Sequence, residues 1–121
     1  MAFDPLTLRL RAFAEAREWQ QFHTPKNLVM ALTGEAGELA ELFQWLDPES
    51  SAQIMTDPDS AERVRHEIAD VLSYLLRLAD VLDVDIAEAL SEKIELNELK
   101  YPVELSKGSS LKYDRLEAEK R

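Results

Sequence analysis

Residues 32–45 read LTGEAGELAELFQW and contain two of the three glycines in the 121-residue chain. Apolar residues recur in this stretch at spacings of three and four, which is typical of an α-helix. Gly34 and Gly37 therefore fall inside a helix, where each costs about 1 kcal/mol relative to alanine. A glycine at such a position usually marks the close approach of another backbone or of a ligand. We expect one of these beside this segment.

The same apolar spacing continues through most of the chain and predicts an all-α fold. Four helices are expected, over residues 5–20, 25–46, 60–82 and 85–102. Residues 47–59 are expected to form a loop, because they hold two prolines, three aspartates and two adjacent serines. Four helices in about 100 residues predict one bundle-like unit.

Each helix has a residue near its start that can cap the first turn. The expected caps are Asp4 before Pro5, Thr24 before Pro25, Asp59 or Ser60, and Asp85, with Glu88 completing the capping-box spacing. Residues 1–102 are thus expected to form the folded domain. Residues 103–121 have little apolar periodicity and are expected to form a polar tail.

The charge and the composition exclude several classes of protein. The chain has 14 Lys and Arg against 24 Asp and Glu, a net charge of −10, which disfavours a nucleic-acid partner. It has no cysteine, and hence no thiol nucleophile, zinc–thiolate site or disulfide. No apolar run is long enough to span a membrane, and the first residues lack the features of a signal peptide. We expect a cytoplasmic protein without a membrane partner.

Two pairs of acidic residues have the spacing that places both carboxylates on one face of a helix. Glu35 and Glu38 form one pair, and Glu67 and Asp70 form the other. Both pairs lie in apolar sequence, so they are expected near the helix interface, where four carboxylates repel one another unless a cation lies among them. Oxygen ligands of this kind select Mg²⁺ or Mn²⁺.

Spacing alone leaves open that these acids are only a solvated surface, which is the commoner role of such a pair. Other metal sites fit less well. A carboxylate-bridged di-iron site needs Glu-x-x-His on two helices, but His23 lies in a loop and His66 directly precedes Glu67. A calcium loop at residues 57–60 would lack its glycine and its closing glutamate.

Several stretches together resemble the MazG-like family of all-α nucleoside triphosphate pyrophosphohydrolases, and within it the dCTP pyrophosphatase branch. They are FHTPKNL at 22–28, GEAGELAELFQW at 34–45, EIADVL at 67–72, Lys93, Asn97, Tyr101 with Pro102, and SSLKY at 109–113. The run at 34–45 is long enough to be specific. The resemblance covers nearly the whole chain.

The resemblance implies Mg²⁺-dependent hydrolysis of dCTP, and of modified dCTP, to dCMP and pyrophosphate, with Mn²⁺ as a possible substitute. It implies that Glu35, Glu38, Glu67 and Asp70 hold the metal, with Glu35 and Glu38 as the catalytic residues. It also implies a homo-oligomer, expected to be a tetramer. The alternatives are hydrolysis of dUTP or of a broad range of nucleoside triphosphates, and a non-catalytic helical oligomerisation module.

The resemblance also assigns the substrate-binding residues. Lys93 and Asn97 share one face of the last helix and are expected to face the phosphates and the sugar, with Tyr101 one turn further on. Trp19 and Trp45, which from their places at helix ends could simply be packing residues, are expected to hold the base. Cytosine-preferring relatives place a histidine on the first helix where this chain has Leu10, which puts strong cytosine selectivity in doubt.

Lys107 and Lys112 in the polar tail have two possible roles. They could fold over the triphosphate of a bound nucleotide, because their positive charges complement the phosphates. The tail could equally have no role in binding.

Overall fold

The computed structural model describes residues 3–108, and every regular element in this range is a helix, which confirms the all-α prediction. Within the described residues the chain forms two compact units, residues 3–84 and residues 85–108, and each is described by itself. The first unit contains α1 (Asp4–Ala16), the 3₁₀ helix η1 (Gln20–Phe22), α2 (Pro25–Glu41), α3 (Pro48–Ala52), the 3₁₀ helix η2 (Ile54–Thr56) and α4 (Pro58–Val81). The second contains α5 (Ile86–Lys100) and α6 (Val103–Ser106).

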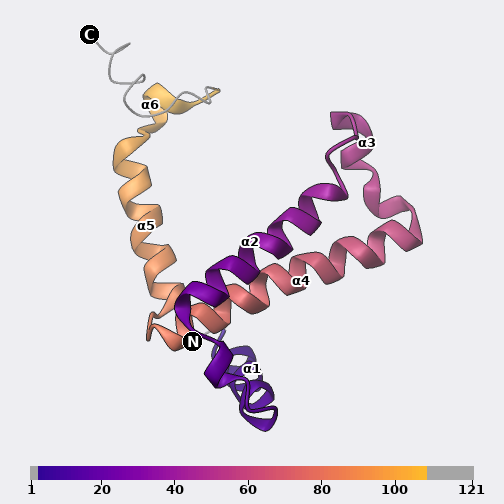
Figure 1. The fold of residues 1–121 in the computed structure, drawn as a ribbon. Coiled ribbons are helices and arrows are strands. Elements are labelled where there is room, and N and C mark those ends of the chain that lie inside the picture. Colours follow the sequence, from indigo (N-terminus) through magenta and orange to yellow (C-terminus); the bar gives the residue numbers. More distant parts are fainter. Residues whose placement is uncertain (1–2, 109–121) are drawn as a thin grey trace. The chain divides into compact units, whose positions relative to one another are not determined.

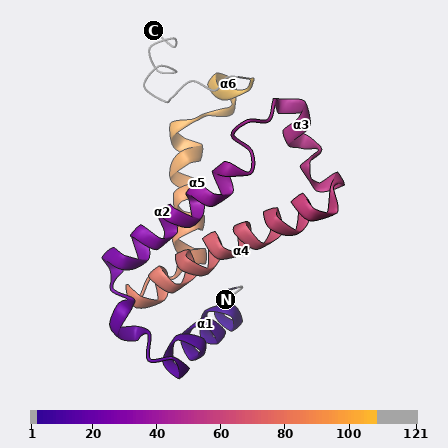
Figure 2. The ribbon, with the colours of Figure 1, turned by 45° about the vertical axis from the view of Figure 1, so that its right-hand side comes forward.

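The first unit is built on the antiparallel pair α2 and α4, which lie side by side along their length (Figures 1 and 2). Helix α1 packs against α4, and the turn η2 packs against the start of α4. The buried apolar side chains among the described residues are Ala14, Leu28, Val64, Leu76 and Ala79. These side chains come from α1, α2 and α4.

Two of the four predicted helix caps are confirmed. The Thr24 hydroxyl accepts a hydrogen bond from the Asn27 backbone N–H at 3.2 Å, and the Asp85 carboxylate accepts one from the Glu88 N–H at 3.1 Å. Each bond satisfies a donor that the first turn of a helix leaves without a partner.

The other two cap predictions are wrong. Helix α4 begins at Pro58, earlier than expected, because Asp57 is its cap and accepts from both the N–H and the hydroxyl of Ser60. Helix α1 already includes Asp4, with Phe3 at the cap position and no side-chain cap bond. Pro58 follows Asp57 at the first helical position, where its fixed φ favours helix initiation.

Two helices end at a residue with left-handed backbone. Glu18 has φ 55°, and the Glu18 and Trp19 N–H groups donate back to the carbonyls of Glu15 and Ala14 at 3.1 and 2.9 Å. This is a Schellman motif, which ends α1 at Ala16 instead of residue 20. Asp83, with φ 56°, ends α4 in the same way.

The segment between α2 and α4 differs from the expected loop. Helix α2 ends at Glu41, followed by turns, and the predicted loop contains α3 and η2. The carboxylate of Asp47 accepts from the Ser50 N–H at 2.7 Å and caps α3. Pro48, directly after this cap, is at the first helical position, where proline favours helix initiation.

Residues 103–108, in the predicted tail, contain the short helix α6, and α5 ends two residues earlier than expected. The SSLKY stretch and Lys112 lie outside the described residues. Within residues 3–108 no helix is both long and apolar enough to cross a membrane.

The two glycines of α2 do not pack against another part of the described chain. A Cβ atom placed on Gly34 or Gly37 would meet nothing within 4 Å among the residues that the structure describes, apart from the helix's own nearby backbone. Among residues 3–108 no other backbone segment approaches these glycines closely. A ligand or a second copy of the chain stays a prediction.

Candidate functional site

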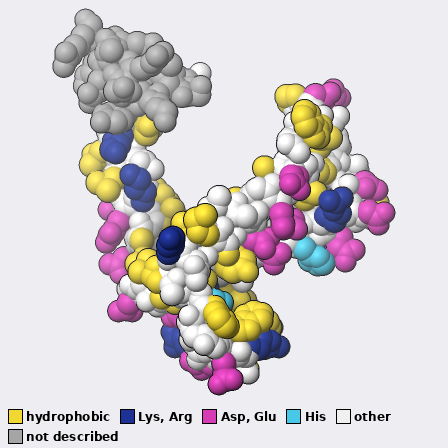
Figure 3. Space-filling model, in the orientation of Figure 1, with side chains coloured by type: hydrophobic (Ala, Val, Ile, Leu, Met, Phe, Trp, Pro, Cys, Tyr) yellow, Lys and Arg dark blue, Asp and Glu magenta, His cyan; other side chains and the backbone are white. Residues whose placement is uncertain are grey.

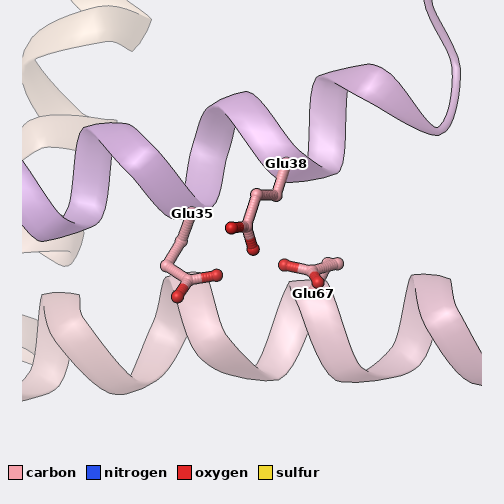
Figure 4. Close-up of side chains that lie close together, drawn as sticks. All are labelled: Glu35, Glu38 and Glu67. Atoms are coloured by element: carbon pink, nitrogen blue, oxygen red, sulfur yellow. The ribbon is translucent and has the colours of Figure 1, made fainter.

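Three carboxylates meet between α2 and α4. Glu35 and Glu38 project from successive turns of α2 toward Glu67 on α4 (Figure 4). One oxygen from each lies within 4.8 Å of the others. Figure 3 shows acidic side chains gathered along these two helices. The spacing Glu-x-x-Glu on α2 and the antiparallel packing of α4 are sufficient to bring these three groups together.

The oxygens of this cluster lack hydrogen-bond donors. One oxygen (Oε2) of Glu35 and one (Oε2) of Glu67 are buried and have no hydrogen-bond partner. Burial, together with the neighbouring carboxyls of Glu38, Glu67 and Asp70, raises the pKa of Glu35 to about 7. Such a carboxyl is stabilised by a proton or by a cation. The donor set consists of carboxylate oxygens and fits a hard divalent cation.

Asp70 lies near the cluster but is not one of its three close members. It is exposed, one turn beyond Glu67 on α4, and its charge contributes to the raised pKa of Glu35. Asp70 and Glu35 line the same cavity. Of the four carboxylates in the predicted metal site, the structure thus brings three together and places the fourth beside them. Glu41, at the end of α2, is exposed and lies outside the cluster.

A cavity of about 280 Å³ adjoins the carboxylates. It is lined by Leu10, Phe13, Ala14, Trp19, His23, Glu35, Asp70, Ser73, Tyr74 and Arg77. The Schellman turn after α1 holds Trp19 at the edge of this cavity. The Trp19 ring makes edge-to-face contacts with Phe13 and His23, at ring-centroid distances of 5.5 and 6.2 Å. The cavity is therefore aromatic along one side and acidic at the carboxylate cluster.

A buried arginine forms the basic part of the cavity wall. Arg77 is 8% exposed, donates from Nε to His23 Nδ1 at 3.0 Å and from Nη1 to Asp80 at 2.9 Å. Asp80 also pairs with Arg11 of α1. Burial, followed by the Arg77 charge, lowers the pKa of His23, and its Nδ1 accepts the hydrogen bond from Arg77, so this nitrogen carries no proton. His23 thus ties the segment before α2 to α4.

The other predicted substrate-binding residues are not in this cavity. Trp45 is 88% exposed and does not line it. Lys93 and Asn97 are exposed on α5, and Tyr101 follows that helix, with its N–H donating to the Asn97 carbonyl at 2.8 Å. These three residues belong to the second unit.

Tyr74 and Arg77 were not predicted as site residues. They continue the series Glu67, Asp70 at spacings of four and three, which places all four on one face of α4. This spacing could have identified them. The bond from Arg77 to His23 could not be predicted, because it joins residues 54 positions apart.

Comparison with known proteins agrees with the resemblance seen in the sequence. Residues 31–116 match the MazG-like family. The chain is 46% identical to dCTP pyrophosphatase 1 of Mus musculus over 106 residues, 87% of this chain and 62% of that protein. It is 44% identical to dCTP pyrophosphatase 1 of Homo sapiens, over 89% of this chain and 64% of the relative. The chain thus spans less than two thirds of the length of these relatives.

The fold is also similar to a solved structure. A crystal structure of a pyrophosphatase from Archaeoglobus fulgidus superposes with a TM-score of 0.78 at 40% identity, covering 84% of this chain and 94% of the other. The family match covers more than half of the chain and includes Glu35, Glu38 and Glu67. The chain belongs to the MazG-like family.

Proposed function

We propose that this protein is a metal-dependent pyrophosphohydrolase that converts dCTP, and modified dCTP, to dCMP and pyrophosphate. The observation that carries the proposal is the cluster of Glu35, Glu38 and Glu67, with two buried oxygens that lack donors. The adjoining aromatic cavity gives room for a planar base. The relatives named dCTP pyrophosphatase 1 support dCTP as the substrate.

Glu35, Glu38 and Glu67, with Asp70 beside them, would hold Mg²⁺ or Mn²⁺. When bound, the ion would neutralise triphosphate charge and make a water molecule more acidic. In the proposed reaction the water oxygen bonds to the α-phosphorus, and the bond from this phosphorus to the bridging oxygen of pyrophosphate breaks. The water proton passes to Glu35 or Glu38.

The remaining substrate contacts are assigned to both units of the chain. We assign Trp19 to stacking on the base, because it lines the cavity next to the carboxylates. We assign Trp45, Lys93, Asn97 and Tyr101 to the base, phosphates and sugar on the family resemblance. They would complete the site from another copy of the chain.

We propose a homo-oligomer, with a tetramer as the expected assembly. Large apolar side chains are exposed along both units, which favours burial against further copies. Among them are Phe22 at 59%, Met30 at 62%, Leu90 at 56% and Leu99 at 79% exposure. The net charge of −10 disfavours a nucleic-acid partner. We place the activity in the cytoplasm, as expected for an enzyme of the free nucleotide pool.

A broader nucleotide range is the second candidate function. Leu10 lines the cavity with an apolar side chain and offers the base no hydrogen bond. The wall contributed by α1 therefore does not discriminate among bases by polar contacts.

One assay tests these candidates. The protein is incubated with canonical and 5-modified deoxynucleoside triphosphates, with Mg²⁺ or with EDTA, and pyrophosphate release is measured. We expect Mg²⁺-dependent release, fastest from dCTP and its modified forms. Equal release from all substrates would favour the broad-range enzyme. No release from any substrate would contradict the proposal and favour the non-catalytic module.

A further inference from the structure

Arg77 has hydrogen-bonding capacity that the described protein does not use. A guanidinium carries five N–H donors. The structure shows protein acceptors for two of them, His23 Nδ1 and the Asp80 carboxylate. No acceptor among residues 3–108 is found for the other three. The side chain is 8% exposed and lines the cavity.

The guanidinium is held in a fixed orientation. Its Nε is tied to His23 and its Nη1 to Asp80, which is itself held by Arg11. These contacts come from the segment before α2, from α4 and from α1. A planar group fixed at two of its nitrogens presents its remaining N–H bonds in a set geometry and loses little entropy when a ligand binds.

The order of side chains along α4 matches the order of groups along a nucleotide. Glu67 and Asp70 lie at the carboxylate cluster, Tyr74 follows one turn later, and Arg77 lies roughly 10 Å beyond Asp70 along the helix axis. With the α-phosphate at the acidic end, the aromatic side chains flank the base. The far edge of the base would then face Arg77.

A fixed guanidinium favours a ligand edge with two adjacent acceptors. Cytosine presents such a pair, O2 and unprotonated N3. Uracil and thymine carry a hydrogen on N3, which would oppose an N–H of the guanidinium. Leu10 supplies no competing polar contact. An arginine on the α4 wall of the cavity would therefore favour cytosine over uracil and thymine.

We infer that Arg77 is a specificity-determining residue, whose free N–H groups donate to O2 and N3 of a cytosine base. The inference rests on the proposed function, since it takes the cavity to be the base site of a nucleotide pyrophosphohydrolase. It adds the group that selects the base. His23 and Asp80 are the positioning residues that hold the guanidinium in place.

The test compares kcat/KM for dCTP and dUTP in the wild type, Arg77→Met and Arg77→Lys. Arg77→Met keeps much of the side-chain length, and Arg77→Lys keeps the charge beside Asp80 but loses the planar fork. We expect the preference for dCTP over dUTP to fall by about tenfold or more in both variants. The matched control is Arg63→Met, which removes an exposed arginine from the same helix and should leave the preference unchanged.

A structural role for Arg77 predicts a different result. It would lower the thermal stability, or reduce kcat/KM for both substrates equally, and leave their ratio unchanged. That outcome would overturn the inference while the proposed function stands. If the wild type released no pyrophosphate from any nucleotide, the proposed function itself would fail, and the inference with it.

A binding measurement covers the case in which both Arg77 variants fail to fold. Calorimetry with dCMP and dUMP on the wild type, without metal, compares the two bases in the absence of turnover. Tighter binding of dCMP supports the inference. Equal binding of the two monophosphates contradicts it.

Discussion

At the scale of single residues, the site depends on charged groups whose partners are unevenly distributed. Glu35 and Glu67 each have a buried oxygen that no donor satisfies, whereas Asp80 receives hydrogen bonds from both Arg11 and Arg77. An unsatisfied buried oxygen costs about 1–3 kcal/mol. A cation bound at Glu35 and Glu67 would therefore stabilise the protein. Asp80, in contrast, already has hydrogen-bond donors within the chain.

Replacing Glu67 with Gln tests the carboxylate cluster. The change removes one of three mutually repelling charges, so we expect the metal-free protein to unfold at a higher temperature. It also removes a ligand, so we expect the affinity for Mg²⁺ or Mn²⁺ to fall by about tenfold or more. Thermal unfolding with and without the ion measures both effects. A variant whose unfolding temperature rises on adding the ion as much as the wild type's would show that Glu67 is not a ligand.

Asp80→Asn should weaken the protein in a pH-dependent way. The hydrogen bond from Arg11 holds the pKa of Asp80 below its ordinary value of 3.8, against partial burial, with the charges of Arg11 and Arg77 acting in the same direction. The stabilisation is therefore fully present above about pH 4 and is lost as the pH falls through the lowered pKa. We expect a loss of about 1–3 kcal/mol at pH 7, because Arg77 is buried beside Asp80.

Urea unfolding at pH 7 and at pH values below 4 measures this effect. The gap in free energy of unfolding between the wild type and Asp80→Asn should shrink as the pH falls. A gap that stays constant would show that the carboxylate charge of Asp80 does not stabilise the fold.

At the scale of secondary-structure elements, helix ends place the site residues. The Schellman turn after α1 positions Trp19, and the Thr24 cap starts the helix that carries Glu35 and Glu38. Both turns that end α1 and α4 use a residue other than glycine, Glu18 and Asp83, at positive φ. Left-handed backbone is unfavourable for such residues. These turns therefore carry an unfavourable conformational free energy, which contacts in the surrounding structure offset.

Glu18→Gly should stabilise the first unit. Glycine adopts φ near 55° without steric cost, so we expect the free energy of unfolding to rise by about 0.5–1 kcal/mol after the entropy of the unfolded chain is included. Thermal or urea unfolding measures this increase in the free energy of unfolding. Glu15→Gly, one turn earlier and inside α1, is the matched control and should destabilise. A destabilising Glu18→Gly would contradict the assigned backbone geometry.

The sequence predicted the helical class and two caps, because these depend on local spacing and on short-range hydrogen bonds. It also predicted that Glu35, Glu38 and Glu67 share a site, but only by assuming that the acidic faces of two helices pack together, as the family resemblance implies. It failed at the ends of α1 and α2, where Glu18 and the turns after Glu41 carry no glycine or proline signal. The contact between Arg77 and His23 depends on the packing of distant segments, so no local pattern indicates it. The exact position of Asp70 relative to the cluster also depends on how α2 and α4 pack, so no local pattern indicates it.

At the scale of the whole molecule, the core is too small for the apolar surface that the helices carry. The buried apolar side chains of the described residues are few, and many large ones stay exposed on both units. We expect a tetramer by sedimentation equilibrium at micromolar concentration. A monomer under those conditions would contradict the proposed assembly, and it would leave Trp45 and Lys93 without a second copy to complete the site.

The central claim is that the carboxylates between α2 and α4 hold the metal for dCTP hydrolysis. The most direct test is Mg²⁺-dependent pyrophosphate release from dCTP by the wild type, Glu38→Gln and Glu41→Gln. Both variants change a glutamate of α2 to glutamine, but only Glu38 belongs to the cluster. We predict that Glu38→Gln lowers kcat/KM at least about 100-fold and that Glu41→Gln stays near the wild type. Equal activity of the two variants would contradict the claim.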